Sequence, residues 1–145
     1  MSKSIFRSIW SMIIMNILIL IATLTIHELG HALTGKILGC VTARAIIYDS
    51  ENMNPYTELI CLQTQQKVAY SAGLILTTIF GLSFLTIEKP YKMFSIIIIG
   101  FGVFLAALDI VEITRLNVMQ YIFILLGLSS LIIGQILYGI SNIKD

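Results

Sequence analysis

Two histidines and a glutamate in the stretch TIHELGHAL, residues 25–33, have the types and spacing best suited to chemistry. His27 and His31 are four positions apart, so on a helix both rings lie on one face, one turn apart. Two imidazoles at this spacing can bind one zinc ion, each at about 2.0–2.1 Å. Glu28, next to the first ligand, can reach a water at that ion and act as its general base. The alternative is a pair of hydrogen-bonded histidines in a helix bundle.

A catalytic zinc site usually has three protein ligands and a water. The chain has only two histidines, so the third ligand must be a carboxylate or a cysteine. Asp109 and Glu112 are three positions apart near the end of a later apolar run, and on a helix they share a face. Either could bind the metal while the other orients a histidine or a substrate amide. The alternative for both is an interfacial carboxylate pair bonded to Arg115.

The elements that must position these residues are predicted to be transmembrane helices. The chain has 145 residues, of which 57% are hydrophobic and 12% are charged, whereas soluble domains carry about 25% charged residues. Four apolar runs are long enough to cross a bilayer, at about residues 9–38, 68–87, 91–113 and 119–140. We predict helices because only helices and closed barrels satisfy backbone polar groups in lipid. The fold class is therefore an all-α membrane protein of four transmembrane helices, in one domain over residues 1–145.

A polar insert at residues 39–67 separates the first two runs. Its flanks, VTARAIIY and YTELICLQ, are rich in strand-forming residues, and the turn-forming segment DSENMNP lies between them. This pattern predicts a small β-hairpin. Cys40 and Cys61 flank the insert and could meet there, but they do not form a CxxC pair, and the favoured interpretation is two free thiols. The acidic residues of the insert are interpreted as solvated charges; they are Asp49, Glu51 and Glu58.

Each crossing of the membrane reverses the direction of the chain, so the first and third runs point the same way. We call the side of the N-terminus side A and the opposite side side B. The histidine–glutamate group of the first run and the Asp109–Glu112 pair of the third therefore both lie toward side B. Small residues in the second run, Ser71 to Gly73, would allow its helix to approach the histidine helix closely. Basic residues do not decide which side is cytosolic, because five of them fall on side A and four on side B. The net charge of +1 gives no indication of a nucleic-acid partner.

Three motifs, in order along the chain, resemble those of the site-2 protease family of intramembrane zinc metalloproteases. HELGH at residues 27–31 matches the first motif of that family. SAGLILT at residues 71–77 is similar to the second-helix pattern, with Leu74 and Thr77 where the family has proline and asparagine. ALDIVEI at residues 107–113 resembles the motif that supplies the third ligand, with Ile110 in place of glycine. The resemblance implies that Asp109, rather than Glu112, is the third ligand.

The resemblance also implies a function. The expected activity is hydrolysis of peptide bonds in membrane-spanning or membrane-anchored protein substrates, with one zinc ion per chain held by His27, His31 and Asp109. Glu28 would be the catalytic base, and the hairpin would pair with an extended substrate segment. The family's active site faces the cytosol, so the resemblance implies a multi-pass protein of the cell membrane with side B cytosolic. A second donor for the oxyanion is expected besides zinc, and the candidates are Arg115, Asn54 and Tyr56.

Two other functions fit the same residues. One is a catalytically inactive membrane protein with a structural or regulatory zinc site. The other is a metal-ion carrier, which would more often have polar residues along several spans. Imidazole and carboxylate ligands also suit cobalt and iron. The bilayer is an expected partner, and an oligomer or regulatory partner could complete so small a bundle.

Overall fold

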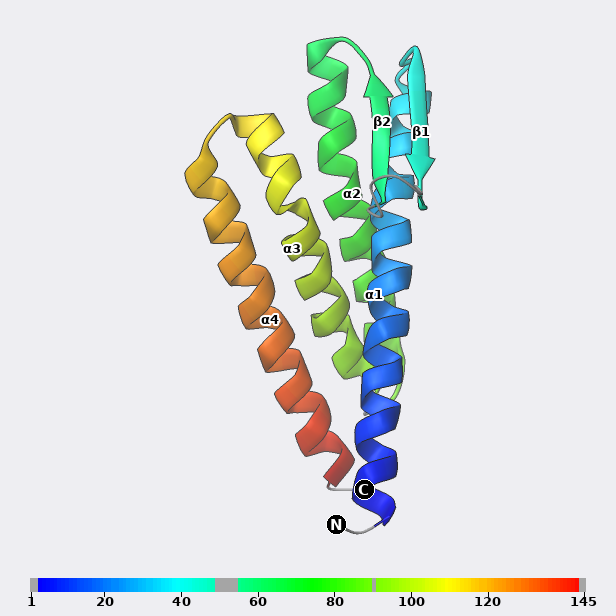
Figure 1. The fold of residues 1–145 in the computed structure, drawn as a ribbon, viewed down its shortest axis with the longest axis vertical. Helices are drawn as coiled ribbons and strands as arrows, with labels where there is room; N and C mark the ends of the chain where they lie inside the picture. Colours follow the sequence, from blue (N-terminus) through cyan, green and yellow to red (C-terminus); the bar gives the residue numbers. More distant parts are fainter. Residues whose placement is uncertain (1–2, 49–54, 90, 144–145) are drawn as a thin grey trace.

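The computed structural model of the protein describes residues 3–48, 55–89 and 91–143 (Figure 1). Four long helices run along the molecule. They are α1 (Lys3–Ile37), α2 (Gln63–Ser83), α3 (Phe94–Thr114) and α4 (Asn117–Ile143). Short 3₁₀ turns, Phe84–Thr86 and Tyr91–Met93, lie between α2 and α3. Each long helix contains a segment long and apolar enough to cross a membrane, which confirms the four predicted spans.

The predicted hairpin is also confirmed. Strand β1 (Thr42–Ile46) pairs antiparallel with β2 (Tyr56–Ile60), with Thr42 opposite Ile60 and Ala45 opposite Thr57. Helix α2 begins at Gln63, earlier than the predicted residue 68, because the side chain of Gln65 accepts a hydrogen bond from the N–H of Leu62 and so caps the first turn. The same side chain donates to the carbonyl of Leu38, which ties the start of α2 to the end of α1.

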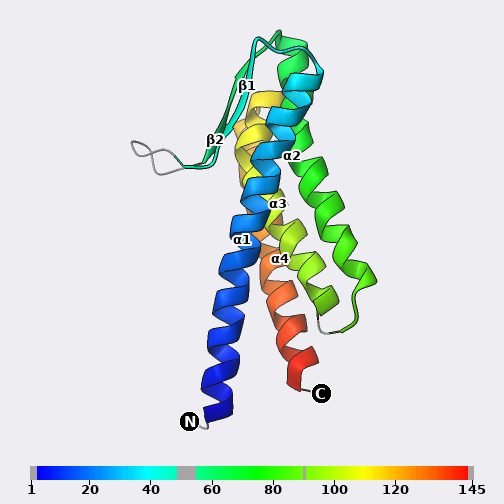
Figure 2. The ribbon, with the colours of Figure 1, turned by 90° about the vertical axis from the view of Figure 1, so that its right-hand side faces the viewer.

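The hairpin lies beside the C-terminal end of α1, at the opposite end of the bundle from the chain termini (Figures 1 and 2). Helix α3 packs against each of the other three long helices and lies between α2 and α4 in the first view. An apolar core of buried residues occupies the half nearer the termini, and it contains Ile19, Phe94, Ile97, Ile98 and Tyr138. The other half of the bundle contains the polar residues of interest.

The interpretation of the cysteines as free thiols is wrong. Cys40 and Cys61 form a disulfide, with their Cα atoms 4.5 Å apart. The physical reason is the strand register, because the N–H of Val41 donates to the carbonyl of Ile60 at 2.9 Å and brings the two flanking cysteines together. The disulfide therefore closes the hairpin at the end where it joins α1 and α2.

The hairpin has an inner and an outer face. Along β2, Thr57 and Leu59 are half-buried, whereas Tyr56, Glu58 and Ile60 are exposed. The inner face lies against α1, since a side chain at Gly35 would come within 2.6 Å of Leu59. This alternation is what places a β2 side chain next to the polar residues of α1.

Candidate metal centre

The histidine and glutamate side chains of α1 form one buried group. His27 and His31 are each 2% exposed and Glu28 is 9% exposed. The two imidazole rings lie edge to face, with their centroids 4.6 Å apart, as expected for positions one helical turn apart. One potential ligand atom from each of the three residues lies within 4.8 Å of the others, so the group could hold a metal ion.

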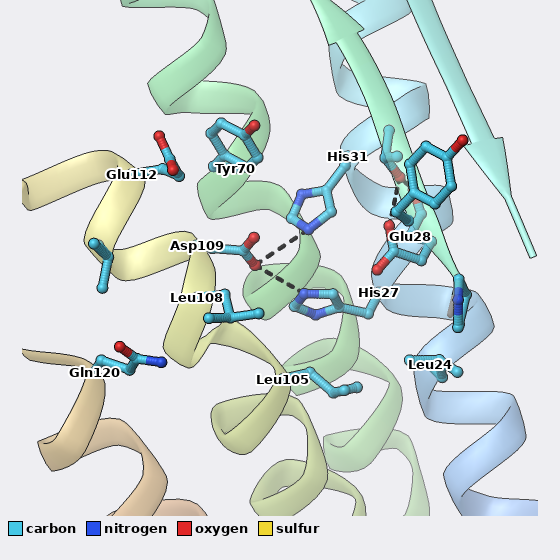
Figure 3. Close-up of a pocket in the computed structure, with 14 residues that line it drawn as sticks. Leu24, His27, Glu28, His31, Tyr70, Leu105, Leu108, Asp109, Glu112 and Gln120 are labelled. Carbon is cyan, nitrogen blue, oxygen red and sulfur yellow. Dashed lines mark hydrogen bonds and ion pairs between the residues drawn. The ribbon is translucent and has the colours of Figure 1, made fainter. Parts of the chain in front are cut away.

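A carboxylate from α3 contacts both histidines. Oδ2 of Asp109 lies 2.8 Å from Nε2 of His27 and 3.2 Å from Nε2 of His31 (Figure 3). Two donors of a tetrahedral zinc ion, each at about 2.0–2.1 Å, are separated by about 3.3 Å. Oδ2 of Asp109 therefore lies at a distance from each histidine Nε2 that is close to the distance between two ligands of one zinc ion. The His27 and His31 rings lie between Asp109 on one side and Glu28 on the other (Figure 3).

The hydrogen bonding of His31 favours metal binding through Nε2. Its Nδ1 lies 2.8 Å from the carbonyl oxygen of Ala69 in α2, an acceptor only, so Nδ1 carries the proton. Nε2 is then a free lone pair, and it is buried without a hydrogen-bond partner. A buried nitrogen left unpaired costs free energy, and the carboxylate oxygen Oδ2 of Asp109, 3.2 Å away, is itself an acceptor, so a metal ion could serve as the partner of this nitrogen. Nδ1 of His27 is also buried without a hydrogen-bond partner, but it is not one of the donor atoms, because His27 contacts Asp109 through Nε2.

The small residues of the second span lie against the histidine helix, as the sequence predicted. A Cβ atom at Gly73 would lie 2.4 Å from Cε1 of His31 and 2.8 Å from Cε1 of His27. A Cβ atom at Gly30 would lie 2.9 Å from the carbonyl oxygen of Ala72. The glycines thus allow α1 and α2 to approach closely at the level of the candidate site, and the backbone of α2 forms its back wall.

We expect Gly73→Ala to displace the imidazoles and lower the bound metal to well below one ion per chain. Gly139→Ala is the matched control, because both glycines are in helices and a Cβ at Gly139 meets nothing within 4 Å. Metal content after purification and the thermal unfolding temperature should be measured for both variants. Equal metal content in Gly73→Ala and Gly139→Ala would contradict the close packing described here.

A cavity of about 460 Å³ opens beside the buried group. Its polar lining includes His27, Glu28, His31 and Asp109, with Tyr70, Glu112 and Gln120 farther out. Its apolar lining comes from Leu24 of α1 and from Leu105, Leu108 and Val111 of α3. Residues Pro55–Thr57 at the start of β2 form another wall. The cavity therefore joins the polar group to an apolar surface and to a strand.

The other candidate residues lie as follows. Glu112 is exposed and lines the cavity, whereas Asp109 is the carboxylate that contacts the histidines. Tyr56 lines the cavity, and Arg115 is exposed at the end of α3, where its N–H donates to the carbonyl of Val111.

Thr77 is buried, and its hydroxyl donates within α2, to the carbonyl oxygens of Gly73 and Leu74. Glu58 is exposed, and Asn54, Asp49 and Glu51 lie outside the described residues.

Two contacts of the site were not predicted from the sequence. The first is the Ala69 carbonyl at His31, a backbone atom that no residue type reveals. The second is Thr57, whose hydroxyl oxygen lies 2.6 Å from Oε2 of Glu28 and 3.0 Å from the carbonyl oxygen of Glu28. Alternation along the strand YTELI could have identified Thr57 as inward-facing, because its neighbours Tyr56 and Glu58 both face outward.

No family model, curated protein or solved structure matches this chain. The indications of function are therefore the chemistry of the buried group and the cavity beside it. That group combines two imidazoles, a carboxylate that contacts both, and a second carboxylate beside them.

Proposed function

We propose that the protein is an intramembrane zinc metalloprotease that hydrolyses peptide bonds of membrane-spanning or membrane-anchored proteins. The observation that carries the proposal is the convergence of Asp109 on His27 and His31, with Glu28 buried next to them. Two imidazoles and one carboxylate form a ligand set typical of catalytic zinc, which keeps one coordination position open. The resemblance of HELGH to the first motif of the site-2 protease family supports the same assignment.

His27, His31 and Asp109 would hold the ion, one per chain. When bound, zinc supplies Lewis acidity toward a carbonyl oxygen and makes water a nucleophile near neutral pH. In this assignment Glu28 is not a zinc ligand, so its carboxylate accepts the proton of the attacking water. It then delivers that proton to the amine that leaves. Of the candidates for a second donor to the developing oxyanion, Tyr56 is one that lines the cavity.

The cavity suits a substrate that arrives from the bilayer. Leu24, Leu105 and Leu108 line it with apolar surface, so an apolar substrate segment would not have to be transferred into a polar cleft. Pro55 and the first two residues of β2, Tyr56 and Thr57, line the same cavity, so that an extended segment added to this strand would have its carbonyls accessible. Water is required as a co-substrate, and the polar residues Glu112 and Gln120 at the cavity would favour its entry.

The position of the polar group argues against a metal-ion carrier. A carrier needs ligands along a path through the membrane. The half of the bundle beyond the site instead contains the apolar core around Ile97 and Ile98, both 0% exposed. The polar pair that lies there, Asn16 with Gln135, is uncharged and its two side chains are hydrogen-bonded to each other. A purely structural zinc site, in turn, has no use for a buried glutamate beside the ligands. Both alternatives predict a zinc-loaded protein that cleaves nothing.

The test of the proposal is a cleavage assay in vesicles. The probe is a library of single-span model proteins with glycine, proline or asparagine at the depth of the site, because these residues open a helix to attack. In water enriched in ¹⁸O, hydrolysis would label the new carboxyl termini, which mass spectrometry detects. We expect labelled products from the zinc-loaded protein and none after zinc is removed with a chelator. Zinc-loaded protein that yields no product from any member of the library would contradict the proposal.

The orientation in the membrane is a separate part of the proposal. The resemblance implies that side B faces the cytosol. The Cys40–Cys61 disulfide lies on side B, and disulfides persist in oxidising compartments and are rare in the cytosol. We therefore propose that side B, with the candidate site and the hairpin, faces away from the cytosol.

A pair of reporter fusions would decide the orientation. Helix α4 ends on side A, so we expect a fluorescent protein fused to the C-terminus to lie in the cytosol and fluoresce. Alkaline phosphatase fused at the same place should be inactive, because it needs an oxidising compartment. An active phosphatase with a dark fluorescent fusion would overturn the proposed orientation and favour the one that the resemblance implies.

A further inference from the structure

A side chain of β2, Thr57, is hydrogen-bonded to the candidate base. Its hydroxyl oxygen lies 2.6 Å from Oε2 of Glu28 and 3.0 Å from the backbone carbonyl oxygen of Glu28. Glu28 is only 9% exposed, so little water competes for its carboxylate. The contact joins two parts of the chain that are 29 residues apart, the hairpin and α1.

The geometry gives the hydroxyl a partner in both protonation states of Glu28. A hydroxyl has one proton to donate and two lone pairs to accept with. While Glu28 is ionised, the hydroxyl donates to Oε2 in a charge-assisted bond, which is the stronger kind. Once Glu28 holds a proton, its own O–H can donate to the hydroxyl oxygen. The hydroxyl proton then turns to the carbonyl oxygen of Glu28, the second acceptor within reach.

We propose that Thr57 is a positioning residue, which holds the Glu28 carboxylate in one orientation through the proton transfer. This inference rests on the proposed function, in which Glu28 is the base. A glutamate side chain has several rotatable bonds, and a base works efficiently only when it is held within reach of the proton. On this account the hairpin completes the active site, in addition to any contact that it makes with substrate.

The strand register and the disulfide are what keep Thr57 in place. Thr57 is opposite Ala45 in the strand pair, and a slip of one residue would turn its hydroxyl to the outer face. Cys40 and Cys61 hold the two strands together next to the first pair, Thr42 and Ile60. The covalent closure of the hairpin thus fixes the position of a side chain that bonds to α1.

The experiment compares Thr57→Val, Thr57→Ser and the control Thr25→Val in the full chain. Thr25 is also a threonine, on α1, and its hydroxyl donates to the carbonyl of Ile21 within the same helix. For zinc-loaded Thr57→Val cleaving a model single-span protein, we expect kcat to fall on the order of tenfold or more, with KM and zinc content unchanged. Thr57→Ser keeps the hydroxyl and should retain near wild-type kcat, as should Thr25→Val.

A second readout needs neither zinc nor activity. In chelator-treated protein, the shifts in unfolding temperature caused by Thr57→Val and Glu28→Ala should not add in the double variant, because both remove the same bond. Additive shifts, a kcat of Thr57→Val equal to that of Thr25→Val, or a Thr57→Ser as slow as Thr57→Val would each overturn the inference. If Thr57→Val does not fold, Thr57→Ala replaces it. Wild-type protein that binds no zinc and cleaves nothing refutes the proposed function, and the chelator-treated cycle still tests the contact itself.

Discussion

Glu28→Gln should bind zinc as the wild type does and should lose nearly all cleavage. The amide has almost the shape of the carboxylate, so it leaves the packing around a side chain that is 9% exposed almost unchanged. It cannot take a proton from water, and a positioned general base is typically worth about 10²- to 10⁴-fold in rate. The bond from the Thr57 hydroxyl can still be accepted by the amide oxygen, so the hairpin should stay in place.

The measurement is kcat on a model single-span protein, together with zinc content and unfolding temperature. Glu58→Gln is the matched control, because it makes the same change at an exposed position on the outer face of β2. Glu58→Gln should cleave at the wild-type rate. Turnover by Glu28→Gln within a few-fold of the wild type would remove Glu28 from the role of base, whatever its zinc content.

Asp109→Ala should weaken zinc binding by at least about 100-fold. The loss of a residue that only hydrogen-bonds to a metal ligand typically lowers metal affinity by about 10- to 100-fold, and the loss of a ligand itself should cost more. The reason is that Oδ2 of Asp109 is the atom that contacts Nε2 of both histidines, at 2.8 Å and 3.2 Å. Without it, two imidazoles on one helix remain as ligands, and the chain has no third histidine to replace the carboxylate. The dissociation constant can be measured by competition with a chromophoric chelator in detergent.

Glu112→Ala is the control for this second prediction. Glu112 lies three residues away on the same helix and also lines the cavity, but it is exposed. Its removal should leave zinc affinity within a few-fold of the wild type. The reverse pattern, tight zinc in Asp109→Ala and weak zinc in Glu112→Ala, would make Glu112 the ligand and contradict the site described here.

The sequence was sufficient to predict the helices and the polar group that they bring together. The spacing of His27 and His31 follows from the helical repeat, which fixes their shared face without any knowledge of the rest of the fold. The expectation that Asp109 lies at the same depth needed only the count of crossings and the lengths of the apolar runs. Both rest on lipid as the solvent, which reduces the choice of structure to membrane-spanning helices.

The contacts that complete the site depend on the strand register, and composition does not determine register. Cys40 and Cys61 were interpreted as free thiols because they are 21 residues apart and outside a recognisable motif, yet the hairpin brings their Cα atoms to 4.5 Å. Thr57 has no chemistry of its own that distinguishes it from the other threonines of the chain. Its importance arises only when β2 places it against Glu28. The Ala69 carbonyl illustrates the same limit for a backbone atom.

The most direct test of the account is the zinc content of the wild-type protein, purified folded in detergent without added metal. We expect close to one zinc per chain in the wild type, and none in the variant in which His27 and His31 are both replaced by alanine. Folded wild-type protein that holds no zinc, and takes up none when zinc is supplied, would contradict the account at its centre.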